Sequence, residues 1–259
     1  MAGEITMRRL LLLPFIALVF VVPALADDFH YITAAQIDLV QVLPPPPAPG
    51  SEAQRRDIAA MLTVQRARTK AAAARAIADD PISVFRFADV LGPNFNAAGL
   101  PKSAAFLDHV RRDIDALTSE TRNYWHRDRP FLTDRNIHPA GDLQEGICNG
   151  EPGHGTVAPS CPNGFKYSYP SGHTAFGTAM AIILAQMVPK KRAALFARGW
   201  QYGENRVVGG VHYPTDVEAG RIAASVIVVL MMQNEHFRAD LATAKAELRK
   251  VLRLPALAP

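Results

Sequence analysis

Cysteine is scarce in this sequence, and neither its charge nor its glycine and proline content is extreme. Only two of the 259 residues are cysteines, which excludes a zinc site made of several cysteines or an iron–sulfur cluster and allows one internal disulfide at most. The formal net charge of +4 is small and dispersed, so it does not point to a nucleic-acid polymer as a partner. Twenty prolines and 17 glycines are ordinary numbers and exclude a collagen-like chain. A globular protein of one or two domains is expected.

Long uninterrupted apolar runs are also absent from the chain beyond its N-terminal region. The two most apolar stretches are 174–187, which ends before Pro189, and 215–232, which contains Glu218 and Arg221. Neither reaches about 18 consecutive apolar residues, the length expected of a helix that crosses a membrane. We therefore interpret both as buried core helices and expect no stable membrane insertion of the mature protein.

The N-terminal residues have the three parts of a cleaved secretory signal, in the usual order. The basic pair Arg8-Arg9 precedes an apolar run at 10–22, and Ala24-Leu25-Ala26 is a small-x-small cleavage site. An uncleaved membrane anchor is the alternative, but the run is shorter than the roughly 20 residues that a spanning helix needs. We predict a signal peptide at 1–26 and a periplasmic or secreted mature protein.

The predicted export bears on the two cysteines. In an oxidising compartment Cys148 and Cys161 are expected to form a disulfide, which would close a loop rich in glycine and proline. Such a bridge would stabilise the fold by on the order of 3 kcal/mol. Two free buried thiols are the alternative interpretation.

Helical periodicity dominates the remainder of the sequence, and alternating strand patterns are hard to find. Residues 27–50 are expected to form an extended N-terminal arm that ends in four consecutive prolines, and 51–259 a helical domain. The predicted fold class is all-α, a single-domain helical bundle with two apolar central helices, 174–187 and 215–232. Further helices are predicted at 51–78, 81–92, 103–125, 189–208 and 234–253.

Three short clusters carry side chains that are suited to phosphate chemistry. They are Arg122 with Arg129-Pro130, then Pro170-Ser171-Gly172-His173, then Arg206 with His212 and Asp216. Arginine binds phosphate oxygens through a planar fork of donors, and several arginines at one point stabilise the charge of a phosphoryl group in transfer. Ser171 and Gly172 directly precede an apolar helix, where free backbone N–H groups and the helix dipole favour an anion.

Two histidines could supply nucleophilic and acid–base catalysis. Asp216 follows His212 by four residues, so its carboxylate could hold one imidazole nitrogen and leave the other as a nucleophile. His173 would be free to protonate the leaving oxygen. Each signal is weak alone, because most histidines and arginines are structural or solvated, but the combination and its order are specific.

Taken together, the clusters resemble the signature of the type 2 phosphatidic acid phosphatase superfamily, which reads K-x6-R-P, P-S-G-H and S-R-x5-H-x3-D. This chain reads R-NYWHRD-R-P, P-S-G-H and N-R-VVGGV-H-YPT-D, and every spacing fits. With the export signal, the proline run and the helical tail, nearly the whole mature chain resembles the class A bacterial non-specific acid phosphatases.

The resemblance implies a role for each matched position. His212 would be the nucleophile that forms a phosphohistidine, Asp216 would orient it, and His173 would act as general acid and then as general base. The phosphoryl oxygens would be bound by residues from all three clusters, namely Arg122, Arg129, Ser171, Gly172 and Arg206. The resemblance further implies small phosphomonoester substrates, a phosphotransferase side activity, no metal, no cofactor and a homodimer.

Two positions depart from the family pattern. Arg122 stands where the family has lysine, which keeps the charge but changes reach and donor geometry, so an altered substrate preference is expected. Asn205 replaces the serine before Arg206, and because asparagine also forms hydrogen bonds the consequence is expected to be smaller.

Other functions stay open at this point. A vanadate-dependent haloperoxidase has the same arginine–histidine site, although those enzymes are much longer, and a lipid phosphate phosphatase has a similar HYPTD segment. A non-catalytic phosphate-binding protein would use the same arginines but would need no nucleophile. A metal site at His173, His212 and Asp216 is disfavoured, because the arginines would repel a cation.

Overall fold

The computed structural model describes residues 29–141, 143 and 167–255. Within these residues the regular elements are helices, and the only β-pairing is an isolated bridge between Asp128 and Tyr167. The predicted all-α class is therefore confirmed. The α-helices are α1 (Leu39–Val42), α2 (Glu52–Ala67), α3 (Lys70–Ala78), α4 (Ala88–Leu91), α5 (Pro101–Trp125), α6 (Pro130–Thr133), α8 (Gly172–Met187), α9 (Arg192–Val208), α10 (Pro214–Met231) and α11 (Glu235–Val251). Short 3-10 helices lie at Ala34–Gln36, Val84–Phe87 and Pro189–Lys191.

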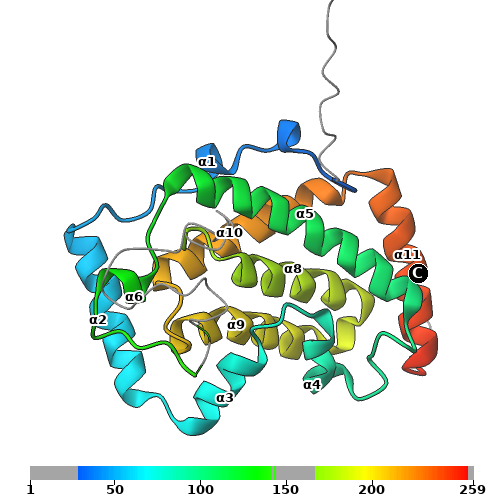
Figure 1. Ribbon diagram of the computed structural model, residues 1–259. Helices are drawn as coiled ribbons and strands as arrows, with labels where there is room; N and C mark the ends of the chain where they lie inside the picture. The colour runs from blue at the N-terminus through cyan, green and yellow to red at the C-terminus, as the bar shows by residue number, and fades with distance from the viewer. Residues whose placement is uncertain (1–28, 142, 144–166, 256–259) are drawn as a thin grey trace, which may run out of the picture.

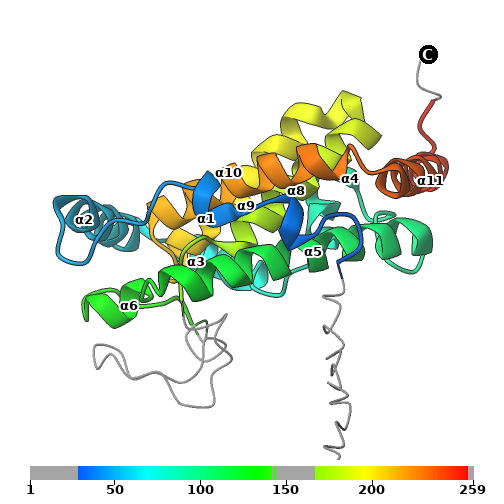
Figure 2. The same cartoon turned by 90° about the horizontal axis from the view of Figure 1, so that it is seen from above.

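Helix α8 is the centre of the bundle. It contacts α9, α10 and α5, while α2 and α11 lie at opposite ends of the molecule (Figures 1 and 2). Most side chains of α8 are buried, and α10 is also largely apolar and buried on the side that faces it. Since apolar residues surround these two helices, the predicted central pair corresponds to α8 and α10. No helix of the described segments is both long and apolar enough to cross a bilayer.

Glycine lets the backbones of these helices approach closely at the N-terminal end of α8. A Cβ atom added to Gly220 of α10 would lie 2.6 Å from the carbonyl oxygen of Ser171, and one added to Gly203 of α9 would lie 2.7 Å from a methyl carbon of Thr174. Larger side chains would push α9 and α10 away from this point. The start of α8 is therefore held tightly between its two neighbours.

The helices expected at 81–92 and 189–208 each begin with a 3-10 segment, and two other segments differ more from the prediction. The single helix expected at 51–78 is two helices, because Thr69 caps the start of α3 by accepting a hydrogen bond from the backbone N–H of Ala72. The arm expected to be extended at 27–50 contains a 3-10 turn and α1, and it is anchored where the carboxylate of Asp113 accepts the backbone N–H groups of His30 and Tyr31. Its last part, 43–50, which contains the four consecutive prolines, has no helix.

Some expectations fall on residues that the structure does not describe. The predicted signal peptide at 1–26 and both members of the predicted disulfide, Cys148 and Cys161, lie outside the described residues. These expectations stay predictions.

Candidate active site

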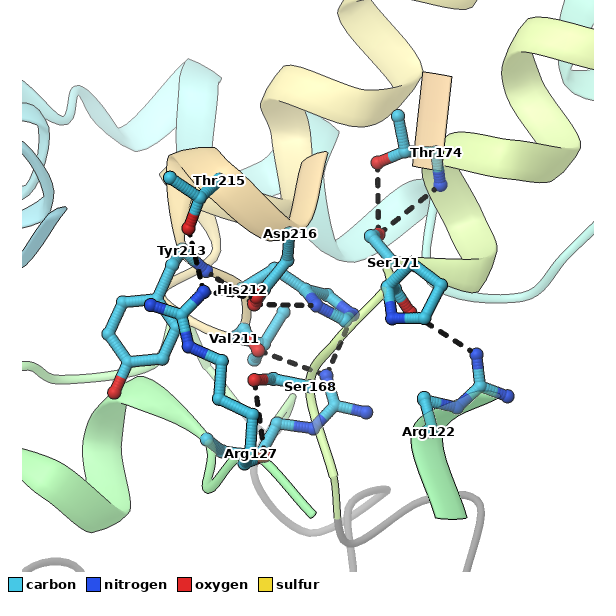
Figure 3. A network of polar contacts seen from close by, with 12 residues as sticks. Arg122, Arg127, Ser168, Ser171, Thr174, Val211, His212, Tyr213, Thr215 and Asp216 are labelled. Carbon is cyan, nitrogen blue, oxygen red and sulfur yellow. Dashed lines mark hydrogen bonds and ion pairs between the residues drawn. The ribbon is translucent and has the colours of Figure 1, made fainter. Parts of the chain in front are cut away.

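The residues singled out from the sequence lie where five segments meet around the start of α8. The end of α5 carries Arg122, the residue before α6 is Arg129, and the end of α9 carries Arg206. Gly172 and His173 are the first residues of α8, and Ser171 is its N-cap. His212 and Asp216 flank the start of α10 (Figure 3). Direct contacts or close electrostatic interactions link all three sequence clusters.

His212 is buried between a carboxylate and a guanidinium group. Its Nδ1 lies 3.4 Å from Oδ2 of Asp216, and its Nε2 lies 2.8 Å from Nη1 of Arg129. Because arginine can only donate, Nε2 must be the acceptor, and the proton of the neutral ring then sits on Nδ1. Burial, and after it the charges of Arg129 and Arg206, holds the pKa of His212 well below its ordinary value. The ring is therefore neutral, with a lone pair on Nε2 that faces the arginines.

Asp216 is fully buried and firmly held. Its Oδ1 accepts from Nη1 of Arg127 at 2.6 Å, and its Oδ2 accepts from the backbone N–H of Tyr213 at 2.9 Å. Burial raises the pKa of the Asp216 carboxyl above its ordinary value, although Arg127 opposes the rise. Its backbone carbonyl accepts the N–H of Ser171 at 3.0 Å, so the start of α10 is bonded to the start of α8.

The three arginines of the sequence clusters lie close enough to repel one another. Burial, together with the charges of Arg122 and Arg206, lowers the pKa of Arg129 to about 9. The same mutual repulsion acts on His212, whose pKa all three arginines depress. A positive potential of this kind is relieved by a bound anion, so the site is suited to a phosphoryl group.

Gly172 leaves room for the guanidinium group of Arg122 at the start of α8. A Cβ added at Gly172 would be 2.8 Å from Nη1 of Arg122. The arginine is held by Oγ of Ser119, which accepts from Nη2 at 2.6 Å, and by Asp115 at 3.6 Å. Ser171 caps α8, its Oγ accepting from the backbone N–H and the hydroxyl of Thr174. The start of α8 thus presents its N-terminal backbone beside a fixed guanidinium group.

His173 is the second imidazole of the site and is held by Asp80. Its Nε2 is 2.7 Å from the backbone carbonyl of Asp80, which can only accept, so Nε2 carries a proton. The Asp80 carboxylate pairs with Nη2 of Arg206 at 2.7 Å. Burial, with Arg206 next, lowers the pKa of His173 well below its ordinary value, and His212 and Arg129 add to the effect. The two imidazoles and the arginines therefore share one electrostatic environment.

Three residues of this arrangement escaped the sequence analysis. Arg127, Asp57 and Asp80 contact predicted site residues or their partners, yet none belongs to the matched clusters. Arg127 had a weak signal, because it stands between Arg122 and Arg129. Asp57 and Asp80 had none, because their partners are 70 and 126 positions away in the chain.

Asn205, one of the two departures from the family pattern, points away from the site. Its Nδ2 donates to Oδ2 of Asp79 at 2.7 Å, and the same buried carboxylate binds Arg198 and Arg86. This network fastens α9 to the end of α3.

Replacing Asn205 with serine, the family residue, is expected to change stability more than activity. Serine is too short to reach Asp79 in the same way, so one hydrogen bond to a buried carboxylate is lost. We expect the free energy of unfolding to fall by about 1–2 kcal/mol with kcat nearly unchanged, as measured by denaturant unfolding and steady-state assays. A large fall in kcat at unchanged stability would contradict this structural role.

Within the described segments, no group of three or more His, Cys, Asp or Glu residues is placed to hold a metal ion. Arg129 lies next to Nε2 of His212, and Arg127 lies next to the Asp216 carboxylate.

Comparison with known proteins identifies relatives of one kind. The profile described as the PAP2 superfamily matches residues 114–240. An acid phosphatase of Zymomonas mobilis is 31% identical over 217 residues, which cover 82% of this chain and 76% of that protein. Non-specific acid phosphatases of Salmonella typhimurium and Salmonella typhi are 29% and 28% identical, covering 80% and 92% of this chain and 78% and 91% of theirs.

Proposed function

Since this chain belongs to the PAP2 superfamily and is a phosphomonoesterase of the acid phosphatase type, we propose that it hydrolyses small phosphomonoesters through a phosphohistidine at His212. The observation that carries the proposal is the state of His212, which is neutral, buried, and directs Nε2 toward Arg129. A nucleophile for phosphorus needs this lone pair at a site where anionic oxygens are stabilised.

In the first half of the reaction, Nε2 of His212 attacks phosphorus and the P–O bond to the leaving group breaks. The phosphoryl oxygens are bound by Arg129, Arg122 and Arg206, with the Ser171 hydroxyl and the Gly172 N–H at the start of α8. Arg129 then donates to a phosphoryl oxygen in place of Nε2. Asp216 stabilises the imidazolium that forms, and protonated His173 gives its proton to the leaving oxygen.

In the second half, water attacks phosphorus opposite the P–N bond. His173, now neutral, takes the proton from the water, and the electron pair of the P–N bond returns to Nε2. Inorganic phosphate and the original state of both histidines result. An alcohol in place of water gives a new phosphomonoester, which is the phosphotransferase side activity.

We also propose the localisation, cofactor requirement and oligomeric state that the sequence and its family resemblance lead us to expect. The enzyme is exported to the periplasm or the exterior after loss of residues 1–26, acts without a metal or cofactor, and forms a homodimer. Support for export comes from the order of basic, apolar and small residues at the N-terminus. The neutral His212 and its arginine neighbours support chemistry that needs no Lewis acid.

A substrate panel tests the proposed function against its alternatives. Purified enzyme should release phosphate from nucleotides and sugar phosphates at acid pH, with a rate unchanged by a chelator. Turnover of phosphatidic acid in preference to these would favour a lipid phosphate phosphatase. Halide oxidation after addition of vanadate would favour a haloperoxidase, and tight phosphate binding with no hydrolysis would favour a binding protein.

The pH dependence should distinguish the free enzyme from the enzyme with substrate bound. Burial and Arg206 lower the pKa of His173 in the empty site, but a bound phosphoryl group adds negative charge and raises that pKa again. His173 then stays protonated to higher pH. With an alkyl phosphate such as glycerol phosphate, the alkaline limb of kcat should therefore lie at higher pH than that of kcat/KM. Coincident alkaline limbs would contradict this role of His173.

A further inference from the structure

Arg127 is a buried arginine whose planar fork joins two carboxylates from distant segments. Nη1 donates to Oδ1 of Asp216 at 2.6 Å and to Oγ1 of Thr215 at 2.7 Å, and Nη2 donates to Oδ2 of Asp57 on α2 at 2.8 Å. The guanidinium carbon lies 3.9 Å from the centre of the Tyr213 ring. Arg127 and the His212 ring lie on opposite sides of the Asp216 carboxylate (Figure 3). The fork thus fixes the carboxylate from the side away from the imidazole.

The backbone of Arg127 is fixed as well. Its carbonyl oxygen accepts from the N–H of Ser168 at 2.8 Å and from the Ser168 hydroxyl at 3.2 Å. Ser168 leads within three residues to Ser171, at the cap of α8. Arg127 therefore connects the start of α8 with the start of α10 and, through Asp57, with α2.

The charge on Arg127 acts directly on Asp216. Burial raises the pKa of Asp216, and Arg127 is the foremost of the groups that lower it again. Asp57 acts in the opposite sense, because it pairs with the same guanidinium group and offsets part of its charge. The other titratable or charged groups that act on Asp216 or on its partner His212 include Arg129, Tyr169, Tyr213, Arg122, Arg206 and His173.

We propose that Arg127, balanced by Asp57, is a positioning residue that keeps Asp216 ionised and aimed at Nδ1 of His212. The inference rests on the proposed function of His212 as nucleophile. An ionised Asp216 keeps the proton of the neutral ring on Nδ1 and the lone pair on Nε2. A protonated Asp216 would donate to Nδ1 instead. The proton of the neutral ring would then sit on Nε2, which would have no lone pair with which to attack.

Two variants of opposite electrostatic sign test this role. In Arg127→Gln the cation is lost, so the pKa of Asp216 rises and the acid limb of kcat/KM for an aryl phosphate should move to higher pH by roughly one unit or more. In Asp57→Asn the competing carboxylate is lost, so the acid limb should move to lower pH. Each variant removes one partner of the same ion pair between α2 and the site, and each is therefore a structural control for the other.

A merely structural role for Arg127 predicts a different result. Both variants would then lose rate at every pH while the acid limb stays where it is in the wild type. Alternatively, the acid limbs of the two variants would move in the same direction. Either result overturns the inference. Arg127→Lys keeps the charge, so the acid limb of this variant should lie between the acid limbs of the wild type and of Arg127→Gln. If Arg127→Gln does not fold, the acid limbs of Asp57→Asn and Arg127→Lys decide whether the inference holds. If the wild-type enzyme has no phosphatase activity, the proposed function is refuted. If the wild type is active but the acid limbs of the variants do not move, only this inference is refuted.

Discussion

Replacing His212 with alanine is expected to abolish turnover while the site still binds phosphate. Alanine removes Nε2, the atom proposed to attack phosphorus, and no neighbouring group can replace a covalent nucleophile. A loss of kcat on the order of 10⁴-fold or more is expected. The phosphate-binding groups should stay in place, since Arg129 also donates to the backbone carbonyl of Val211 at 3.0 Å, and Arg206 to Asp80.

Three measurements separate loss of chemistry from loss of structure in this variant. Steady-state assays give kcat, calorimetry gives phosphate affinity, and labelled substrate shows whether phosphate becomes attached to the protein. Wild type should become labelled and His212→Ala should not. His236→Ala, which changes an exposed histidine of α11, is the matched control and should behave as wild type. Substantial turnover by His212→Ala would show that the nucleophile lies elsewhere.

The predicted elements that depend on local pattern correspond closely to the structure. The nearly continuous apolar run at 174–187 becomes α8, and the structure extends it back to Gly172 because Ser171 supplies the cap. The break between α2 and α3 was missed, since alanine and arginine continue the helical pattern on both sides of Thr69. A threonine cap inside a run of helix formers gives no periodic signal.

Elements that depend on distant contacts could not be predicted in the same way. Tyr31 is almost fully buried in the arm because α5 supplies Asp113 for its backbone N–H and α11 supplies Asp240 for its hydroxyl. Neither partner is visible from the composition of residues 27–50. The arm therefore looked extended and polar in the sequence, whereas tertiary contacts fold its first half onto the bundle.

The site shows the same division between local and distant information. Spacing alone pointed to His212 and Asp216, because the start of a helix between them brings positions four apart together. By contrast, the carbonyl that holds Nε2 of His173 belongs to Asp80, 93 positions earlier in the chain. The residues proposed to bind substrate thus lie in short motifs, whereas the groups that hold them come from distant parts of the chain.

The second large effect is expected at His173, and it should depend on the leaving group. In His173→Gln no side chain at this position can protonate the departing oxygen, so an alkyl phosphate should lose about 10²- to 10⁴-fold in kcat. A nitrophenolate leaves without a proton, so the first half of the reaction should survive with nitrophenyl phosphate. The second half should still be slow, because no base takes the proton from the attacking water.

His173→Gln should therefore accumulate the phosphohistidine that wild type turns over. Rapid mixing with nitrophenyl phosphate should give a burst of about one nitrophenolate for each site, followed by slow turnover, and the protein should carry labelled phosphate. His138→Gln, a change at an exposed histidine, should show neither effect. An equal loss of rate with alkyl and aryl phosphates, without a burst, would mean that His173 supports the site through its bond to Asp80 and moves no proton.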